Sequence, residues 1–178
     1  MPGIKSLLSS KKAIFITSIV ILMIISILTV LFIITRNTST QISPNTSSLQ
    51  PEYQTVLPAG KTIEQLGGWS KISPPKSDPV YAYSDKIGTV GISVSEQLLP
   101  ETFKNNLDTQ VAELAKKFNA TTQIEAAGTK AYIGTSAKGP QSAIITQDGL
   151  LILIKSQEKI SVADWKTYIQ SLTPASKY

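Results

Sequence analysis

The chain has 178 residues, of which 17 are Lys or Arg and 12 are Asp or Glu, and it contains neither Cys nor His. This composition excludes disulfides, thiolate nucleophiles, zinc sites built from Cys or His, and a Ser-His-Asp triad. Four basic residues, Lys5, Lys11, Lys12 and Arg36, flank one apolar segment, and the 12 acidic residues nearly balance the other 13 basic ones. The excess charge therefore indicates membrane topology, and no nucleic-acid partner is expected.

Residues 13–35 form an uncharged run of 23 residues, 16 of which are Leu, Ile, Val or Phe. As a helix the run would measure about 34 Å, which is enough to span a hydrocarbon core of about 30 Å. Because three Lys residues precede it, the positive-inside rule predicts a cytoplasmic tail at residues 1–12 and a single-pass anchor in the cell membrane. A cleaved signal peptide is the alternative, although its apolar core would be shorter, about 7–15 residues.

The remaining chain divides by composition into two parts. Residues 36–60 are rich in Ser, Thr, Asn, Gln and Pro, and such a segment buries too little apolar surface to offset the entropy of ordering it. Residues 36–60 are therefore predicted to form a flexible linker. Residues 61–178 have the length of one domain. With the N-terminus in the cytoplasm, this domain is predicted to be extracytoplasmic and to lie close to the membrane surface.

The first elements predicted in this domain are a helical turn and a hairpin. Residues 62–66 form a single helical turn that ends at two glycines, and a Pro-rich loop follows. Residues 80–84 and 89–95 are rich in β-forming side chains, and in the second run Val90, Ile92 and Val94 alternate with small residues. This alternation is typical of a strand with one buried face. Turn residues at 85–88 join the two strands.

A single long helix is predicted after Pro100, followed by four strands and a last helix. The helix is indicated by apolar residues at helical spacing: Phe103, Leu107, Val111, Leu114, Ala115 and Phe118. Strands are predicted at residues 122–127, 131–136, 141–146 and 150–154. The five consecutive large aliphatic residues of the last run indicate a central strand that is covered on both faces, and Asp148-Gly149 is a strong hairpin signal before it.

The final helix is predicted from Ser161, which with Asp164 resembles a capping box, to just before Pro174. Short connections and tight turns between the strands favour antiparallel pairing. The predicted fold class is therefore α+β: an antiparallel β-sheet of about six strands with helices packed on its faces, preceded by one transmembrane helix.

Over residues 66–172 the order of elements resembles that of PsbP-like domains. The residues that carry the resemblance are Gly68-Trp69, Pro79-Val80-Tyr81, Asp85, the alternating run 90–95, Phe103 and the Asp148-Gly149 turn. The resemblance implies an α-β-α sandwich that acts by binding, because PsbP-like members are mostly non-enzymatic accessory or extracytoplasmic proteins. It implies no particular ligand, and no functional residue is carried over.

Two kinds of hydrolytic chemistry remain compatible with the composition. A lysine can activate a serine nucleophile, and Ser73 and Lys76, or Ser9 and Lys12, have a suitable spacing. Pro74 and Pro75 separate the first pair and remove the helical turn that would align it. Two carboxylates across a cleft support glycoside hydrolysis, but the candidates all stand in turn contexts, where Asp usually bonds its own backbone: Asp78, Asp85 and Asp148.

Four aromatic residues are candidates to line a carbohydrate or peptide groove: Trp69, Tyr81, Tyr83 and Tyr132. Tyr81 and Tyr83 share one face of a predicted strand, and aromatic rings with a polar tip suit such grooves. Trp165 could line the groove with them. The alternative is that several of these aromatic residues belong to the core, because strand aromatics usually pack against helices.

The sequence thus predicts a single-pass membrane protein that presents a non-catalytic binding or accessory domain outside the membrane. Its expected partners are the lipid bilayer, through residues 13–35, and an unidentified extracytoplasmic protein or cell-envelope ligand. No catalytic residue, cofactor or metal site is predicted. The alternatives are an envelope hydrolase that uses carboxylates or a Ser-Lys pair, and an assembly module of a membrane protein complex.

Overall fold

A computed structural model describes residues 49–175 of the chain. The main sheet contains β2 (Ser70–Lys71), β3 (Val80–Ile87), β4 (Val90–Leu98), β5 (Thr122–Ala126), β6 (Thr129–Thr135), β7 (Gln141–Gln147) and β8 (Leu150–Ser156). A second, two-stranded sheet pairs β1 (Val56–Pro58) with β9 (Leu172–Pro174). The helices are α2 (Glu101–Lys104), α3 (Leu107–Lys117) and α4 (Val162–Ser171). The architecture is α+β, as the sequence predicts.

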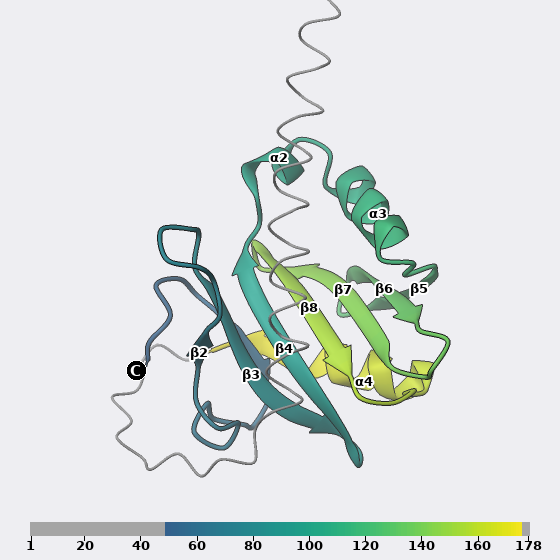
Figure 1. The fold of residues 1–178 in the computed structure, drawn as a ribbon, viewed down its shortest axis with the longest axis horizontal. Helices are drawn as coiled ribbons and strands as arrows, with labels where there is room; N and C mark the ends of the chain where they lie inside the picture. Colours follow the sequence, from purple (N-terminus) through teal and green to yellow (C-terminus); the bar gives the residue numbers. More distant parts are fainter. Residues whose placement is uncertain (1–48, 176–178) are drawn as a thin grey trace, which may run out of the picture. The chain divides into compact units, whose positions relative to one another are not determined.

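The seven strands of the main sheet are all antiparallel and follow the order β2-β3-β4-β8-β7-β6-β5 (Figure 1). β8 is the middle strand, and its residues Leu150, Leu151, Ile152 and Ile154 are buried. The unbroken aliphatic run predicts this position correctly, since only a central strand covered on both faces can bury side chains that point both ways.

Two-residue turns fix the register of the hairpins. Ala127 and Gly128 between β5 and β6 have φ values of 52° and 72°, and Asp148 and Gly149 between β7 and β8 have 51° and 76°. Positive φ at both central positions is the signature of a type I′ turn, whose twist matches that of the flanking strands. The hairpin predicted at Asp148-Gly149 is confirmed.

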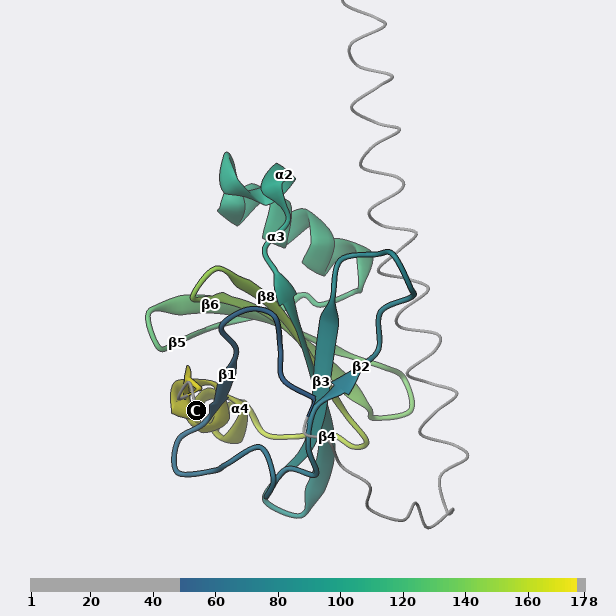
Figure 2. The ribbon, with the colours of Figure 1, turned by 90° about the vertical axis from the view of Figure 1, so that its left-hand side faces the viewer.

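The two faces of the sheet carry different elements (Figure 2). Helices α2 and α3 lie on one side, which we call the α3 face; α4, β1 and β9 lie on the other, the α4 face. Ser161 caps the N-terminus of α4: its hydroxyl accepts a hydrogen bond from the Asp164 backbone N–H at 3.1 Å. Trp165 and Ile169 of α4 are fully buried against the sheet. The apolar stripe of the last helix therefore forms much of the core.

The single long helix predicted after Pro100 is wrong, because the structure has two helices. α2 ends at Lys104, and α3 begins at Leu107. Asn106 lies between them with φ −151° and ψ 58°, which is not helical. Asn favours helix ends over helix interiors because its amide competes for nearby backbone groups. The apolar spacing continues across the break, and so the pattern alone does not reveal it.

Part of the predicted linker is folded. Val56 and Leu57 are buried, and β1 pairs with β9 in the register Val56↔Pro174 and Pro58↔Leu172. The domain therefore begins before residue 61. The helical turn predicted at residues 62–66 is present as a turn, in which Leu66 and Gly68 both donate backbone hydrogen bonds to Ile63.

The predicted tail, the transmembrane segment at residues 13–35 and the pair Ser9 and Lys12 lie outside the described residues. Within residues 49–175, no helix has the length and apolar character needed to cross a membrane.

Candidate binding groove

Three of the four predicted groove aromatics lie together. The ring centroids of Trp69 and Tyr83 are 5.3 Å apart, and those of Trp69 and Tyr81 are 6.3 Å apart, both with edge-to-face geometry. Tyr81 and Tyr83 are only 1% and 3% exposed. These two tyrosines therefore belong to the core, and only Trp69 of the three is half-buried. Tyr53 packs edge-to-face on Tyr81 and extends the cluster.

Tyr132 lies on the opposite face of the sheet from this cluster. The register connects Tyr83 through Val94, Ile154 and Ala143 to Ile133 of β6. Side chains of adjacent residues on a strand point to opposite faces, and so Tyr132 points to the α3 face. The structure therefore brings Trp69, Tyr81 and Tyr83 together and separates Tyr132 from them.

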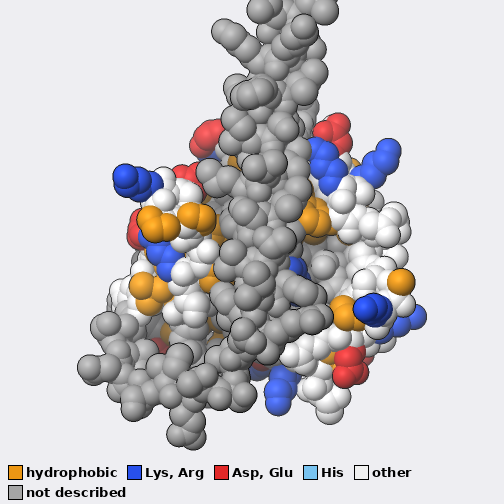
Figure 3. Space-filling view, in the orientation of Figure 1, with side chains coloured by type: hydrophobic (Ala, Val, Ile, Leu, Met, Phe, Trp, Pro, Cys, Tyr) orange, Lys and Arg blue, Asp and Glu red, His pale blue; other side chains and the backbone are white. Residues whose placement is uncertain are grey.

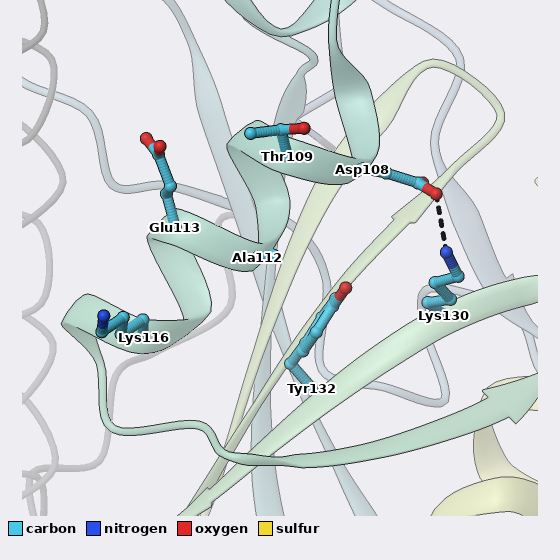
Figure 4. Close-up of a pocket in the computed structure, with 7 residues that line it drawn as sticks. All are labelled: Asp108, Thr109, Ala112, Glu113, Lys116, Lys130 and Tyr132. Atoms are coloured by element: carbon cyan, nitrogen blue, oxygen red, sulfur yellow. Dashed lines mark hydrogen bonds and ion pairs between the residues drawn. The ribbon is translucent and has the colours of Figure 1, made fainter.

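Tyr132 instead lines an open groove of about 450 Å³ between α3 and β6 (Figure 4). The lining residues are Asp108, Thr109, Ala112, Glu113, Lys116, Lys130 and Tyr132. Figure 4 shows the Tyr132 side chain reaching from β6 toward α3. A second hollow of about 490 Å³ shares Asp108, Lys130 and Tyr132 and extends to the β5–β6 and β7–β8 turns. We call the two together the α3–β6 groove.

An ion pair lies where the two hollows of the groove meet. Lys130 Nζ is 2.6 Å from Asp108 Oδ2, and its hydrogen bond to Asp108 raises the pKa of Lys130. Both side chains are exposed, so the pair contributes little to folding stability. Either charge can therefore exchange its partner for a group of a ligand at little cost to the fold.

The candidate hydrolytic residues are not arranged for catalysis in this structure. The Ser73 hydroxyl has no hydrogen-bond partner among the described residues, and Lys76 is exposed in a turn with φ 70°. Lys76 therefore does not receive the proton of Ser73, which base activation requires. Among the acidic candidates, Asp85 forms an ion pair with Lys61, Asp78 is exposed in a loop, and Asp148 lies in a tight turn.

A buried carboxyl group was not anticipated from the sequence. Glu96 of β4 is 0% exposed; its Oε2 accepts a hydrogen bond from the Val56 backbone N–H of β1 at 3.0 Å, and its Oε1 has no partner among the described residues. Burial raises the pKa of Glu96 to about 8. The signal was present, because Glu96 continues the inward-facing alternation of Ile92 and Val94.

Glu96 lies in a polar cluster beneath β1 on the α4 face. The Tyr83 hydroxyl, the Tyr168 hydroxyl and Asp85 Oδ2 are also buried without a hydrogen-bond partner among the described residues. Burial raises the pKa values of Tyr83 and Tyr168. The cluster contributes no lining residue to the α3–β6 groove.

The α3–β6 groove is thus an open concave surface that combines a half-buried aromatic ring with charges of both signs. Within residues 49–175 no three acidic residues converge as a metal site would require. A ligand in the groove could pack against the Tyr132 ring, hydrogen-bond to the threonine hydroxyls and form ion pairs with Asp108 and Lys130. These groups suit the binding of a ligand. In comparisons with protein-family models, curated proteins and solved structures, nothing matches this chain.

Proposed function

We propose that this chain is a single-pass membrane protein whose extracytoplasmic, PsbP-like domain is a non-catalytic accessory module that binds a protein of the cell envelope. The binding site in this proposal is the α3–β6 groove. The observation that carries it is the position of Tyr132, half-buried in an open groove beside the exposed Asp108–Lys130 ion pair.

The groove suits a polypeptide segment. A tyrosine ring supplies a large rigid contact area and keeps a polar tip, which is why tyrosine is enriched at protein interfaces. Asp108 and Lys130 provide one charge of each sign, and Glu113 and Lys116 repeat this arrangement farther along α3. A peptide with its own opposite charges can pair with both signs, and the match of charges would set its orientation.

The charge of the folded part also favours a protein partner. Figure 3 shows acidic and basic side chains interspersed around the visible rim of the domain. A surface that attracts nucleic acid would instead gather Lys and Arg on one face. The mixed surface fits the near balance of charge that follows residue 36 in the sequence.

The proposal is tested by photo-crosslinking the full chain in the membranes of producing cells. A photoreactive amino acid replaces Thr109 or Tyr132 in the groove, and the matched control replaces Lys138, which is exposed in the β6–β7 turn and lines neither hollow. We expect both groove positions to form an adduct with the same envelope protein and the control position to form none.

A second variant distinguishes recognition from chance proximity. Lys130→Asp places two acids where the ion pair stands, and it should reduce the Thr109 adduct several-fold, because the charge pattern read by the partner is lost. Equal adducts at all three positions would contradict the proposal. Hydrolysis of an envelope polymer or peptide by the purified full chain, abolished by a single Ser, Lys or Asp substitution, would instead establish the hydrolase alternative.

A further inference from the structure

The two edges of the main sheet are built differently. β2 at one edge has only two residues, whereas β5 at the other has five, Thr122–Ala126. β5 pairs on one side only, with β6. Proteins usually protect long edges with Pro, Lys, bulges or a covering segment, and β5 contains neither Pro nor Lys. Helix α4 packs against β5 on the α4 face, but no backbone hydrogen bond joins the two elements among the described residues. The outer edge of β5 can therefore still pair with another strand.

The register identifies which backbone groups are free. Ala126 and Thr129 flank the two-residue turn, so they form a hydrogen-bonded pair, and the pairs Ile124↔Ala131 and Thr122↔Ile133 follow by alternation. Gln123 and Glu125 consequently direct their N–H and C=O groups away from β6. Among residues 49–175, no hydrogen bond from outside the hairpin reaches these groups.

The alternation of hydrogen-bonded and non-hydrogen-bonded pairs can be checked in the β3–β4 hairpin. Ile87 and Val90 flank the two-residue turn between β3 and β4, so Gly91 should direct its backbone groups outward. The Gly91 carbonyl does accept a hydrogen bond from the Gln157 N–H at 3.1 Å, on the side of β8. The alternation therefore applies to β5 as well.

We propose that β5 pairs antiparallel with β5 of a second copy of this chain, about a twofold axis at Ile124. In this register Gln123 of each copy faces Glu125 of the other, and each of these two pairs exchanges two backbone hydrogen bonds. All the outward backbone groups of Gln123 and Glu125 are then satisfied in both copies. The two seven-stranded sheets form one continuous sheet, and the interface is closed, as a twofold contact requires.

Side chains favour this register over the one centred on Glu125. Glu125 faces the neutral Gln123 of the other copy, whose amide can donate to the carboxylate, whereas a register centred on Glu125 would oppose two like charges. Ile124 meets its own counterpart at a non-hydrogen-bonded pair, where side chains come closest. Ile124 is only partly buried against the core of one copy, and pairing buries it further. β5 can thus pair with its own copy without opposing like charges, and a second copy is the partner that we propose for this edge.

The self-pairing leaves the α3–β6 groove accessible. A twofold axis perpendicular to the sheet keeps the α3 faces of both copies on the same side, and no residue of β5 lines the groove. The dimer would therefore present two grooves side by side. Self-association and partner binding are separate properties and can fail separately.

Disulfide trapping tests the pairing in the full chain, in membranes. Because the chain has no Cys, a disulfide in the Ile124→Cys variant reports contact between two copies at this position alone. Non-hydrogen-bonded pairs bring Cα atoms to about 4.5 Å, a separation that a disulfide can bridge. We expect rapid oxidation to a species of twice the 19.2 kDa chain mass. Ser84→Cys is the matched control: Ser84 is an exposed residue of β3, and this variant should remain monomeric.

Charge variants provide a second readout that needs no Cys. Gln123→Glu opposes Glu125 across both symmetric pairs and should weaken dimerisation of the full chain in detergent roughly three- to tenfold, while Gln123→Lys should strengthen it by a similar factor. The double variant Gln123→Glu with Glu125→Gln exchanges the two side chains and should restore the original affinity. All of these positions are exposed, so the variants should fold alike.

Three results would overturn the proposal. The first is trapping at Ile124→Cys no faster than at Ser84→Cys. The second is dimerisation that is identical in Gln123→Glu, Gln123→Lys and the unmodified chain. The third is a disulfide-linked product in which Ile124→Cys joins a different protein, which would show that another chain occupies the edge.

Discussion

The carboxyl group of Glu96 lies in the core, at a position where strand alternation leads one to expect an apolar side chain. Its one hydrogen bond, from the Val56 N–H, ties β1 to the main sheet. A buried carboxylate without a positive partner is strongly disfavoured, so the group remains protonated to higher pH. A single proton thus contributes to holding the first strand of the domain in place.

This proton makes stability depend on pH. The pKa of Glu96 is raised from 4.5 to about 8 in the folded chain, so between these values the folded state binds one more proton than the unfolded state. The free energy of unfolding therefore decreases as pH rises through this window, by at most roughly 1.4 kcal/mol per pH unit. Denaturation of the full chain at pH 5 and pH 8 measures the effect.

Glu96→Gln should remove most of this dependence, because the amide is neutral at both pH values and can still accept from Val56. The variant should gain stability relative to the unmodified chain as pH rises. Glu96→Ala is the control, since it leaves the Val56 N–H unsatisfied and should lower stability at both pH values. If the free energy of unfolding changed with pH in the same way for Glu96→Gln and the unmodified chain, Glu96 would not be the group that causes the pH dependence.

Among the elements, those with a regular period or a strong turn were predictable. β4, β7 and β8 follow from alternation, from continuous apolar runs or from the Asp148-Gly149 turn. β3 follows only in part: the turn predicted at residues 85–88 is wrong, because the strand continues to Ile87, which pairs with Val90. β1, β2 and β9 have two or three residues each, which is too few to show a period. The pairing of β1 with β9 joins segments 116 residues apart, and local sequence carries no signal for such a contact.

The candidate site was also predictable only in part. The sequence names Tyr132 as a possible groove residue but groups it with the aromatics of β3, because it does not specify which strands share a face. The groove needs α3 packed over β6, and its lining residues Thr109 and Lys130 come from elements that meet only in the folded chain. Tyr81 and Tyr83 illustrate the reverse case, since strand aromatics resemble one another in sequence whether they line a surface or the core.

Gly134 sets how closely the end of α3 approaches β6. A Cβ at this position would lie 3.1 Å from Ala120 Cα and 3.1 Å from the Asn119 carbonyl oxygen, both of them backbone atoms. Gly134→Ala should therefore destabilise the full chain by about 1–3 kcal/mol, because backbone cannot move aside as a flexible side chain can.

Gly149→Ala is the matched comparison, since it tests conformation without a clash. A Cβ there would meet nothing within 4 Å, but φ is 76°, so we expect a smaller loss of about 1 kcal/mol from the positive φ alone. Denaturant titrations of both variants measure the difference. A Gly134→Ala variant as stable as the unmodified chain would show that the loop after α3 does not pack on β6 as described.

For the molecule as a whole, we propose that the folded domain is tethered to the bilayer through its N-terminal side. The folded domain begins before residue 61, since β1 is paired and Val56 is buried. The connection between the predicted span and the domain is therefore shorter than composition suggests, and the domain should work closer to the membrane surface. A partner bound in the α3–β6 groove would then be held near the bilayer.

Protease treatment of intact cells that produce the full chain, with detection of both ends, tests whether this domain is displayed outside the membrane on an N-terminal anchor. We expect added protease to remove the C-terminal epitope while the N-terminal tail remains cell-associated and protected. Loss of the C-terminal epitope only after permeabilisation would rule out the proposed display, because it would place the domain in the cytoplasm.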